Sequence, residues 1–464
     1  MRREARSSGT RRATLCLLGV GLVLQACAAD VAGVPLRITH APEQDPFRDA
    51  TELSLRFSRA GVLERQQSFP ADTQSLDLGV LAFGEDLQIE LVVLAGEFEI
   101  ARGASFPFRV QPSSPPPRVD VHVGRLERFT DAGVEPLDGP VMGSSAGPSG
   151  ALVATAKGTL YRYDAHAPAD GRPQLTRLAA YVELAGASWL ALADGGLLAV
   201  GGDLGRARRF GPDGELVVDV RSVELDDQRR GATLVSVDGA AIALGGSPLE
   251  FGGMTTHATR IVPLPDGGLD VVALPALACP TRDGAASRVS IPSVSGGATE
   301  RIALVCGDAL RESRLLVFDP SGASASMETV LPGDLRAAAM APLGVGLLLV
   351  AGGRDPEGVP SDAVHVLALG DGSSSEIAGG SRPLFGGRAG AAASVLSPGR
   401  VLLVGGRDAL ERPLASAEVV TFPGRVVLTG DTPMPMASPH VIELADGTLL
   451  AVDASGMAQY VPRR

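Results

Sequence analysis

The residues of this chain that could carry covalent chemistry are few and lie far apart in the sequence. Residues 143–147, Gly-Ser-Ser-Ala-Gly, have the spacing of the turn that holds the nucleophilic serine in many hydrolases. That turn joins a buried strand to a helix, whereas here no buried run precedes the motif and Pro148 and Gly150 follow it. We therefore interpret 143–147 as a loop and not as a nucleophile.

Metal and cofactor chemistry also lacks a recognisable constellation. The histidines are scattered without paired spacing, and the strings His-Glu-x-x-His and Cys-x-x-Cys do not occur. We therefore predict no catalytic residue, no metal site and no cofactor. The six histidines are His40, His122, His166, His257, His365 and His440.

The beginning of the chain has the organisation of an export signal. Five arginines and one glutamate precede an apolar run from Ala13 to Ala26 that is too short to span a bilayer. The run closes with Leu24-Gln25-Ala26-Cys27, which resembles the cleavage box of bacterial lipoproteins, although Gln25 is unusual there. The resemblance implies a signal peptide over 1–26, a lipid on Cys27 and a tether over 27–33. An ordinary secretory signal with an incidental cysteine is the alternative.

The expected location follows from the same region. No later apolar run reaches the roughly 20 residues that a membrane span needs, so the lipid would be the only anchor. In the related enterobacterial sorting rule, Asp after the cysteine retains a lipoprotein at the inner membrane, whereas Ala28 and Ala29 follow Cys27 here. We expect a cell-envelope protein attached to the outer membrane through its N-terminal lipid, on the periplasmic face or at the cell surface.

Two cysteines remain after the leader and Cys27 are set aside. In an oxidising envelope, Cys279 and Cys306 are expected to form a disulfide. Two buried thiols are the alternative, because the sequence does not determine the distance between them.

Charge narrows the classes of partner. The chain carries −12 and the leader +4, so the part that follows the leader carries −16 and disfavours nucleic acid and anionic lipid surfaces as ligands. Lys157 is the single lysine, and Gly158 follows it, so a phosphate-binding Gly-Lys-Ser/Thr loop is excluded. We expect a monomer.

Composition and patterning predict an all-β chain. With 58 Gly, 34 Pro and 4% aromatic residues in 464, the sequence is rich in turns and has few windows of helical periodicity. Residues 34–124 alternate apolar and polar positions in short runs, for example at 53–57, 87–91 and 119–123. This pattern predicts a small immunoglobulin-like β-sandwich.

The remaining residues, 125–464, contain a repeat. An apolar run followed by Gly-Gly or its remnant recurs seven times, at intervals of 44 to 61 residues. Periods of this length are typical of propeller blades of four strands each, so we predict a seven-bladed β-propeller. The last repeat lacks a fourth strand, which Leu126 to Leu137 could supply to close the ring. The first positions of the pairs are 156, 201, 245, 306, 352, 405 and 453.

The repeat resembles that of the kelch family, in which a hydrophobic strand ends in Gly-Gly and the next strand carries an aromatic residue. Glycine at this point permits positive φ and close approach of neighbouring blades. Most of the family's Tyr and Trp residues are missing, and Phe210, Phe318 and Phe422 lie near the expected Tyr positions. A copper radical oxidase, the enzyme that this architecture most invites, needs a tyrosine–cysteine pair and two histidines. The tyrosines, Tyr161, Tyr163, Tyr181 and Tyr460, offer no such set.

Long loops after the second strand of several repeats are the predicted binding surface. In a four-stranded meander these loops share a face with the crossovers between blades, and those at 247–257, 354–362 and 407–414 are enlarged. Acidic residues at 203, 308, 355 and 408 recur after the glycines, so we expect them to cap backbone amides. The candidate binding residues are Arg354, Asp355, Glu357, Arg407, Asp408, Glu411 and Arg412.

These features favour a lipid-anchored envelope protein whose propeller is a non-catalytic scaffold for a protein or glycan partner. The alternative is a hydrolase or lyase that acts on envelope polysaccharide at the propeller funnel. A third interpretation is a purely structural part of an envelope assembly.

Overall fold

The computed structural model describes residues 34–463 apart from short gaps. The predicted signal peptide, Cys27 and the tether lie outside the described residues, as do His166, Asp203 and Asp308. No helix in the described part of the chain is long and apolar enough to cross a membrane. The gaps are 74–75, 77, 79–80, 82–83, 112–116, 166–172, 203–204, 229, 249–251, 265–267, 294–295, 308–311, 323–324, 371–372 and 378–382.

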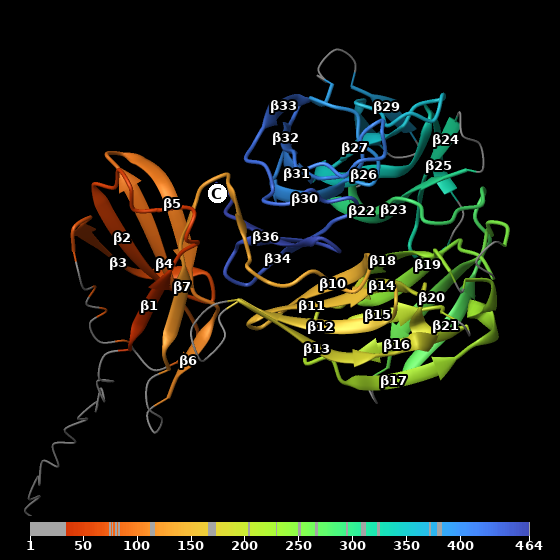
Figure 1. Cartoon of the computed structure of the whole chain (residues 1–464). Coiled ribbons are helices and arrows are strands. Elements are labelled where there is room, and N and C mark those ends of the chain that lie inside the picture. Colours follow the sequence, from red (N-terminus) through yellow and green to blue (C-terminus); the bar gives the residue numbers. More distant parts are fainter. Residues whose placement is uncertain are drawn as a thin grey trace, which may run out of the picture.

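The first unit consists of two sheets (Figure 1). Five strands of the larger sheet follow the order β3-β2-β4-β5-β8, β6 pairs with β4, and β1 pairs in parallel with β7. Alternate residues of β2 and β4, such as Leu55 and Leu91, pack against Val121 of β7 and bury one face of each sheet. The immunoglobulin-like assignment of this unit stays a prediction. The strands are β1 (Leu36–Thr39), β2 (Glu52–Arg59), β3 (Val62–Pro70), β4 (Gly84–Ala95), β5 (Phe98–Ala104), β6 (Phe108–Val110), β7 (Val119–His122) and β8 (Gly124–Arg125).

The rest of the described chain folds into seven four-stranded antiparallel sheets. Their first strands contact one another in chain order, and the first strand of the last sheet contacts that of the first, so the sheets form a closed ring (Figure 1). This ring of radial sheets is a β-propeller. The first four sheets are β10 (Val141–Gly147), β11 (Gly150–Thr155), β12 (Thr159–Asp164) and β13 (Gln174–Ala180); β14 (Ser188–Ala191), β15 (Leu197–Val200), β16 (Arg206–Phe210) and β17 (Leu216–Arg221); β18 (Thr233–Val237), β19 (Ala240–Leu244), β20 (Ala258–Pro263) and β21 (Leu269–Leu274); and β22 (Ala286–Pro292), β23 (Ala298–Cys306), β24 (Glu312–Phe318) and β25 (Ala325–Pro332).

The ring is closed by a strand that precedes the first repeat in the sequence. The last sheet has the order β34-β35-β36-β9, and Tyr460 of β36 pairs with Phe129 of β9. This confirms that the stretch 126–137 supplies the missing fourth strand. The remaining strands are β26 (Asp334–Gly344), β27 (Leu347–Arg354), β28 (Val364–Gly370) and β29 (Ser373–Glu376); β30 (Ala392–Ser397), β31 (Arg400–Val404), β32 (Ala417–Thr421) and β33 (Arg425–Leu428); and β34 (His440–Glu443), β35 (Leu449–Asp453), β36 (Gly456–Tyr460) and β9 (Phe129–Asp131). Two short 3₁₀ helices, η1 (Val182–Leu184) and η2 (Val223–Gln228), lie in crossovers.

One expectation is wrong. Residues 143–147 are not a loop but the end of β10, where alternate residues are buried. The run is rich in small residues because β10 is a first strand, and its neighbours leave little room: a Cβ on Gly143 would lie 2.3 Å from Cβ of Trp189. A two-residue turn and β11 follow, so the motif still lacks the helix that a nucleophile turn requires.

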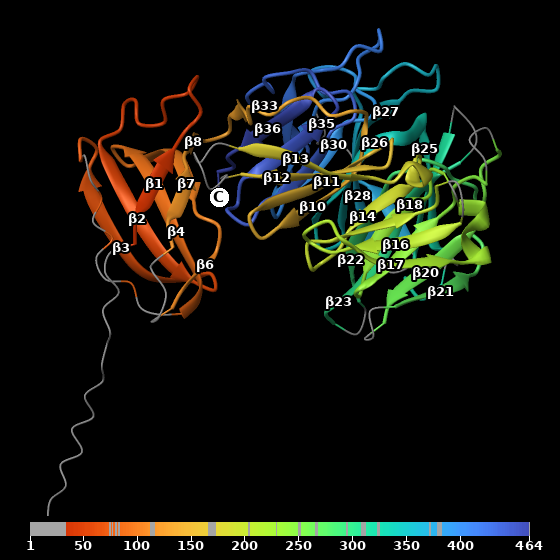
Figure 2. The ribbon, with the colours of Figure 1, turned by 60° about the horizontal axis from the view of Figure 1, so that its bottom comes forward.

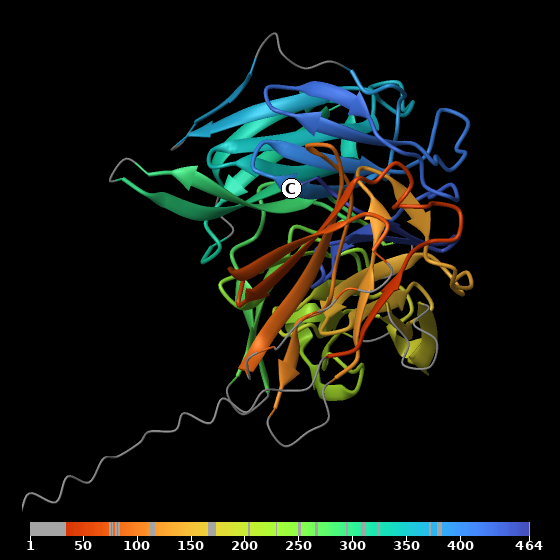
Figure 3. The ribbon, with the colours of Figure 1, turned by 90° about the vertical axis from the view of Figure 1, so that its left-hand side faces the viewer.

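The first unit lies beside the sheets that begin and end the ring (Figures 1 and 2). Arg125 of β8 still pairs with Ala101 in that unit, and four residues later β9 has entered the last sheet. The side chain of Gln44 donates to the Phe129 carbonyl at 2.9 Å. The first unit therefore contacts the strand that closes the propeller. Figure 3 shows this unit in front of the propeller.

The paired glycines join neighbouring sheets. The eight glycines of the four complete pairs have φ between 62° and 102°, as expected for residues that leave a strand in the left-handed region. In three sheets the second glycine donates its N–H to a carbonyl of the crossover before the next sheet. These hydrogen bonds are Gly246 to Thr281 at 2.7 Å, Gly353 to Arg388 at 2.9 Å and Gly406 to Met436 at 2.9 Å.

The same three carbonyls explain why the first glycine has no side chain. A Cβ on Gly245 would lie 2.2 Å from the Thr281 oxygen, one on Gly352 would lie 2.5 Å from that of Arg388, and one on Gly405 would lie 2.6 Å from that of Met436. Side chains do not approach backbone oxygens so closely. Each seam thus depends on one carbonyl that contacts both glycines.

We predict that Gly352→Ala destabilises the propeller more than Gly358→Ala. Both positions have positive φ, which costs an alanine about 1–2 kcal/mol. Nothing lies within 4 Å of a Cβ on Gly358, whereas Gly352→Ala also meets the Arg388 carbonyl and should lose a further 1–3 kcal/mol, roughly. Urea unfolding of the two variants measures the difference, and equal losses would contradict the close contact.

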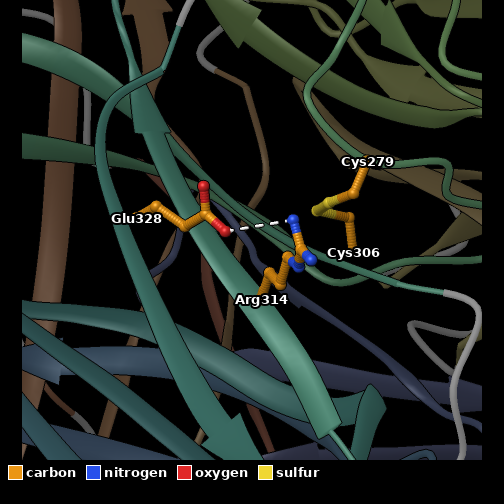
Figure 4. Close-up of a disulfide and its surroundings, with 4 residues drawn as sticks. All are labelled: Cys279, Cys306, Arg314 and Glu328. Carbon is orange, nitrogen blue, oxygen red and sulfur yellow. Dashed lines mark ion pairs between the residues drawn. A yellow bond between two sulfur atoms is a disulfide. The ribbon is translucent and has the colours of Figure 1, made fainter.

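The sheet β22–β25 carries a disulfide at the corresponding position of its second strand, and this bond reaches back to the preceding crossover. Cys306 occupies the first position of the pair and is bonded to Cys279 in the preceding crossover, with the Cα atoms 6.0 Å apart (Figure 4). Both residues are buried among Leu244 and Leu304, between two sheets. Arg314, the strand partner of Cys306, forms an ion pair of 3.2 Å with Glu328 beside the bond.

Replacing both cysteines by alanine should destabilise the protein by about 2–4 kcal/mol, because the bond restricts the unfolded chain. Peptide mapping under non-reducing conditions should recover Cys279 and Cys306 in one cross-linked pair. Recovery of both as alkylated free thiols from the native protein would contradict the bond.

Candidate binding face

The long loops and the crossovers meet on one face of the ring, called here the long-loop face. It is built by the loops after β19, β27 and β31 and by the crossovers before β22, β26, β30 and β34. Backbone bridges tie loop to crossover, as at Thr255 with Thr281 and at Leu414 with Met436. The loops are therefore held at their roots by the ring itself.

Arg354 connects the loops of two neighbouring sheets. Its Nη1 donates to the Gly358 carbonyl at 2.9 Å within its own loop, and its Nη2 lies 2.6 Å from Glu411 Oε1 in the β31–β32 loop. The Arg407 guanidinium donates to the carbonyl of Glu411 at 3.0 Å. The two loops thus form one braced surface.

Asp355 and Asp408 shape the two loops from inside. Asp355 Oδ1 accepts from the N–H groups of Glu357 and Val359 at 3.0 and 2.9 Å. Asp408 Oδ1 accepts in the same way from the second and fourth residues after it, both at 2.9 Å. The expected capping role is confirmed for these two residues.

Arg412 completes the second loop. Its Nη2 lies 2.7 Å from Asp408 Oδ2, and this hydrogen bond is the first cause that lowers the pKa of Asp408. Glu357 is the one member of the predicted set that is exposed and takes no part in this bracing through its side chain. The structure therefore brings six of the seven predicted residues into loop bracing, and their role toward a partner stays a prediction.

A cavity of about 490 Å³ lies on the same face, on neighbouring sheets. Its size falls within the range of roughly 300–1,000 Å³ that is typical of ligand sites. Its lining comes from the β19–β20 loop, the crossover before β22 and the beginning of β26. Its lining comprises Gly252, Gly253, Met254, Arg282, Asp283, Asp334, Arg336 and Ala337.

An ion pair forms one wall of this cavity. Arg336 holds Asp334 with two bonds, from Nε at 2.8 Å and from Nη2 at 2.7 Å, and its Nη1 points to Met254 Sδ at 3.3 Å. Burial alone would raise the pKa of Asp334, but the hydrogen bonds and charge of Arg336, with the charge of Arg354, hold it below its ordinary value. Arg354, which braces the loops, thus also acts through its charge on the Asp334 carboxylate of the cavity.

A buried ion pair supports the face from below. Arg388 and Glu418 are almost fully enclosed and contact each other directly. Arg388 Nη1 also donates to the carbonyls of Gly405 and Ser416, at 3.1 and 3.2 Å, which are the two roots of the β31–β32 loop. Burial lowers the pKa of Arg388, while Glu418 opposes that shift.

The arginines at the beginning of the first strands or just ahead of them were missed by the sequence reasoning, which concentrated on the residues after the glycines. A signal for them exists. Arg230, Arg282, Arg336 and Arg388 recur at intervals of 52 to 54 residues, each followed within three positions by alanine.

Metal chemistry is not indicated by the geometry: no group of three or more His, Cys, Asp or Glu within the described residues is placed to hold a metal ion.

Several solved structures are similar to part of this chain. No family model matches the chain, and no curated protein matches it. A fungal alcohol oxidase of the AA5 family, in complex with copper, is 15% identical, with a TM-score of 0.48 over 72% of this chain and 75% of that one. YjhT is 14% identical (TM-score 0.42; 64% and 99%), and a streptogramin B lyase is 10% identical (0.42; 71% and 96%). At these identities the likeness concerns the fold.

Strand order and ring closure therefore define this chain as a β-propeller protein with an N-terminal unit of two β-sheets. Its candidate site is the long-loop face with its cavity.

We predict that Asp334→Asn costs about 1–3 kcal/mol at neutral pH, because Arg336 loses a buried charged partner. The pKa of Asp334 is lowered in the folded state, so its contribution is present above the unfolded value of about 3.9 and is lost as the pH falls through the folded value. Urea unfolding at neutral pH and near pH 3 should show the gap between wild type and variant closing in acid. Exposed Asp270→Asn is the control, and an unchanged gap for Asp334→Asn would contradict the account.

Proposed function

We propose that this protein is a non-catalytic binding scaffold of the bacterial envelope, and that its long-loop face contacts a protein or glycan partner. One observation carries the proposal. The Arg354–Glu411 pair braces loops of two sheets beside a preformed cavity, so the face is ordered before any partner binds. A preorganised face loses little entropy on binding.

The polysaccharide hydrolase or lyase alternative has less support at this site. A glycosidase needs a carboxylic acid with a raised pKa and a second carboxylate facing it. Asp334 and Asp283 at the cavity are each paired with an arginine, and the pKa of Asp334 is lowered. An ionised, arginine-bound carboxylate is suited to hydrogen bonding and not to proton donation.

Anchoring through Cys27 is part of the same proposal and rests on the sequence. Seven residues, 27–33, precede the first described residue and span at most about 25 Å when extended. The propeller would therefore remain close to the membrane surface and meet partners there.

The anchor has a direct test. The wild-type chain should incorporate labelled palmitate and partition with membranes, and Cys27→Ser should do neither, with Cys16→Ser as the matched control. Label uptake by Cys27→Ser would overturn the lipid assignment.

The binding face can be mapped through the single lysine. Lys157 is exposed in the turn between β11 and β12, and turns between second and third strands belong to the long-loop face. An amine-reactive cross-linker applied to envelope fractions should join the partner to the wild-type chain. Lys157→Arg should abolish the adduct, which shows that it forms at this face.

The cavity arginines provide the decisive comparison. The double variant Arg282→Gln, Arg336→Gln should reduce the Lys157 adduct at least about tenfold, if each lost contact contributes about 1 kcal/mol or more. The exposed Arg425→Gln, at the turn between third and fourth strands on the opposite face, should leave it unchanged. An adduct that survives the double variant would show that the partner does not use this cavity.

A further inference from the structure

A second cavity lies at the junction between the first unit and the propeller, away from the long-loop site. Its volume is about 630 Å³. The first unit contributes the end of β1, the loop after it and His122, and the propeller contributes the end of β9 and Gln459 of β36. It shares no lining residue with the long-loop cavity. The residues are Ile38, Thr39, His40, Ala41, Pro42, His122, Asp131, Ala132, Gly133, Pro173 and Gln459.

Hydrogen bonds between the two units hold the walls of this cavity together. Gln44 Nε2 donates to the Phe129 carbonyl at 2.9 Å, and the Asp131 N–H donates to Glu43 Oε1 at 3.3 Å. Both acceptor and donor on the propeller side belong to the ring-closing strand β9. The cavity is therefore a built feature of the junction, and a ligand would find it already formed.

Two polar side chains that line the cavity, His122 and Gln459, are buried and oriented by hydrogen bonds. His122 is 9% exposed, and its Nδ1 lies 3.3 Å from Thr39 Oγ1 across the β1–β7 pair. Gln459 is 2% exposed, and its Nε2 donates at 3.0 Å to the hydroxyl of Tyr163. Burial raises the pKa of Tyr163, so that hydroxyl keeps its proton. An imidazole and a carboxamide thus line the cavity in fixed orientations, with the Tyr163 hydroxyl behind the carboxamide.

The charges around the cavity exclude two ligand classes. No arginine or lysine is among its described lining residues, which disfavours an anion. Its one carboxylate, Asp131, already accepts the Gly133 N–H at 2.8 Å, and a single such group is a weak site for a polycation. The walls contributed by Ile38, Pro42 and Pro173 are aliphatic.

We propose that this junction cavity binds a neutral saccharide unit. Imidazole and carboxamide groups on a buried floor can hydrogen-bond to hydroxyl groups, and aliphatic walls match the C–H faces of a sugar ring. Since the ligand would touch both units, it would also add to the contacts that hold β9 in the ring.

The test uses the purified full-length chain and saturation-transfer NMR with calorimetric titration. The probes are glucose, N-acetylglucosamine, maltotriose and a dextran polymer as neutral saccharides, with gluconate and spermidine as charged comparisons. A neutral probe should bind with a millimolar or lower dissociation constant and raise the unfolding temperature. The small sugars and the polymer separate a free saccharide from a chain of glycan as the source.

Two variants and one control make the assignment specific. Gln459→Leu removes the carboxamide at similar volume, and Pro42→Trp fills the cavity from its exposed rim; each should weaken binding at least about tenfold. Gln88→Leu is the control, because Gln88 joins the two units by donating to the Ala445 carbonyl but does not line the cavity.

Absence of binding by every neutral probe, preference for gluconate or spermidine, or full binding by both variants would overturn the proposal. Because the Lys157 adduct reports on different residues, it is unaffected by any of these outcomes. The proposed long-loop function and the junction site therefore succeed or fail separately.

Discussion

Three seams of the propeller depend on one repeated interaction, in which one carbonyl of a crossover contacts both glycines of the preceding sheet. The oxygen accepts the N–H of the second glycine and occupies the space where the first would carry a Cβ, as Arg388 does for Gly352 and Gly353. Positive φ at both positions turns the chain out of the strand and toward the next sheet. Neighbouring sheets pack mainly through hydrophobic side chains. The hydrogen bonds of these seams are directional, so they also fix how one sheet is oriented to the next.

The same seams determine where function can reside. Each long loop starts at the second glycine, whose carbonyl accepts a hydrogen bond from the far end of the loop, as at Gly406 and Leu414. A loop fixed at both ends can be enlarged without cost to the ring, and the cavity of Arg336 lies among such loops. The first unit also contacts the ring at a structural element, because Gln44 binds β9, the strand on which ring closure depends.

Much of the fold could be predicted because it follows from periodic features. The Gly-Gly spacing indicated the repeats, the short final repeat indicated the missing strand, and Asp355 and Asp408 indicated capped turns. Residues 143–147 misled because small residues favour loops in isolation, whereas here they pack a first strand against Trp189. The cavity of Arg282 and Arg336 was not predictable from the loops, since its residues are separated by about fifty positions and meet only when consecutive sheets pack together. The junction cavity joins parts of both units, and no local pattern records it.

The central claim is that the second glycine of three pairs, at Gly246, Gly353 and Gly406, joins one sheet to the next and so orders the long-loop face. Hydrogen–deuterium exchange of the Gly246, Gly353 and Gly406 amides measures this directly. The account predicts that all three are protected to nearly the global free energy of unfolding, although they lie at the ends of strands and beside loops. Exchange as fast as that of the loop residues Gly358 and Leu410 would contradict it, because the seams would then be open in the native protein.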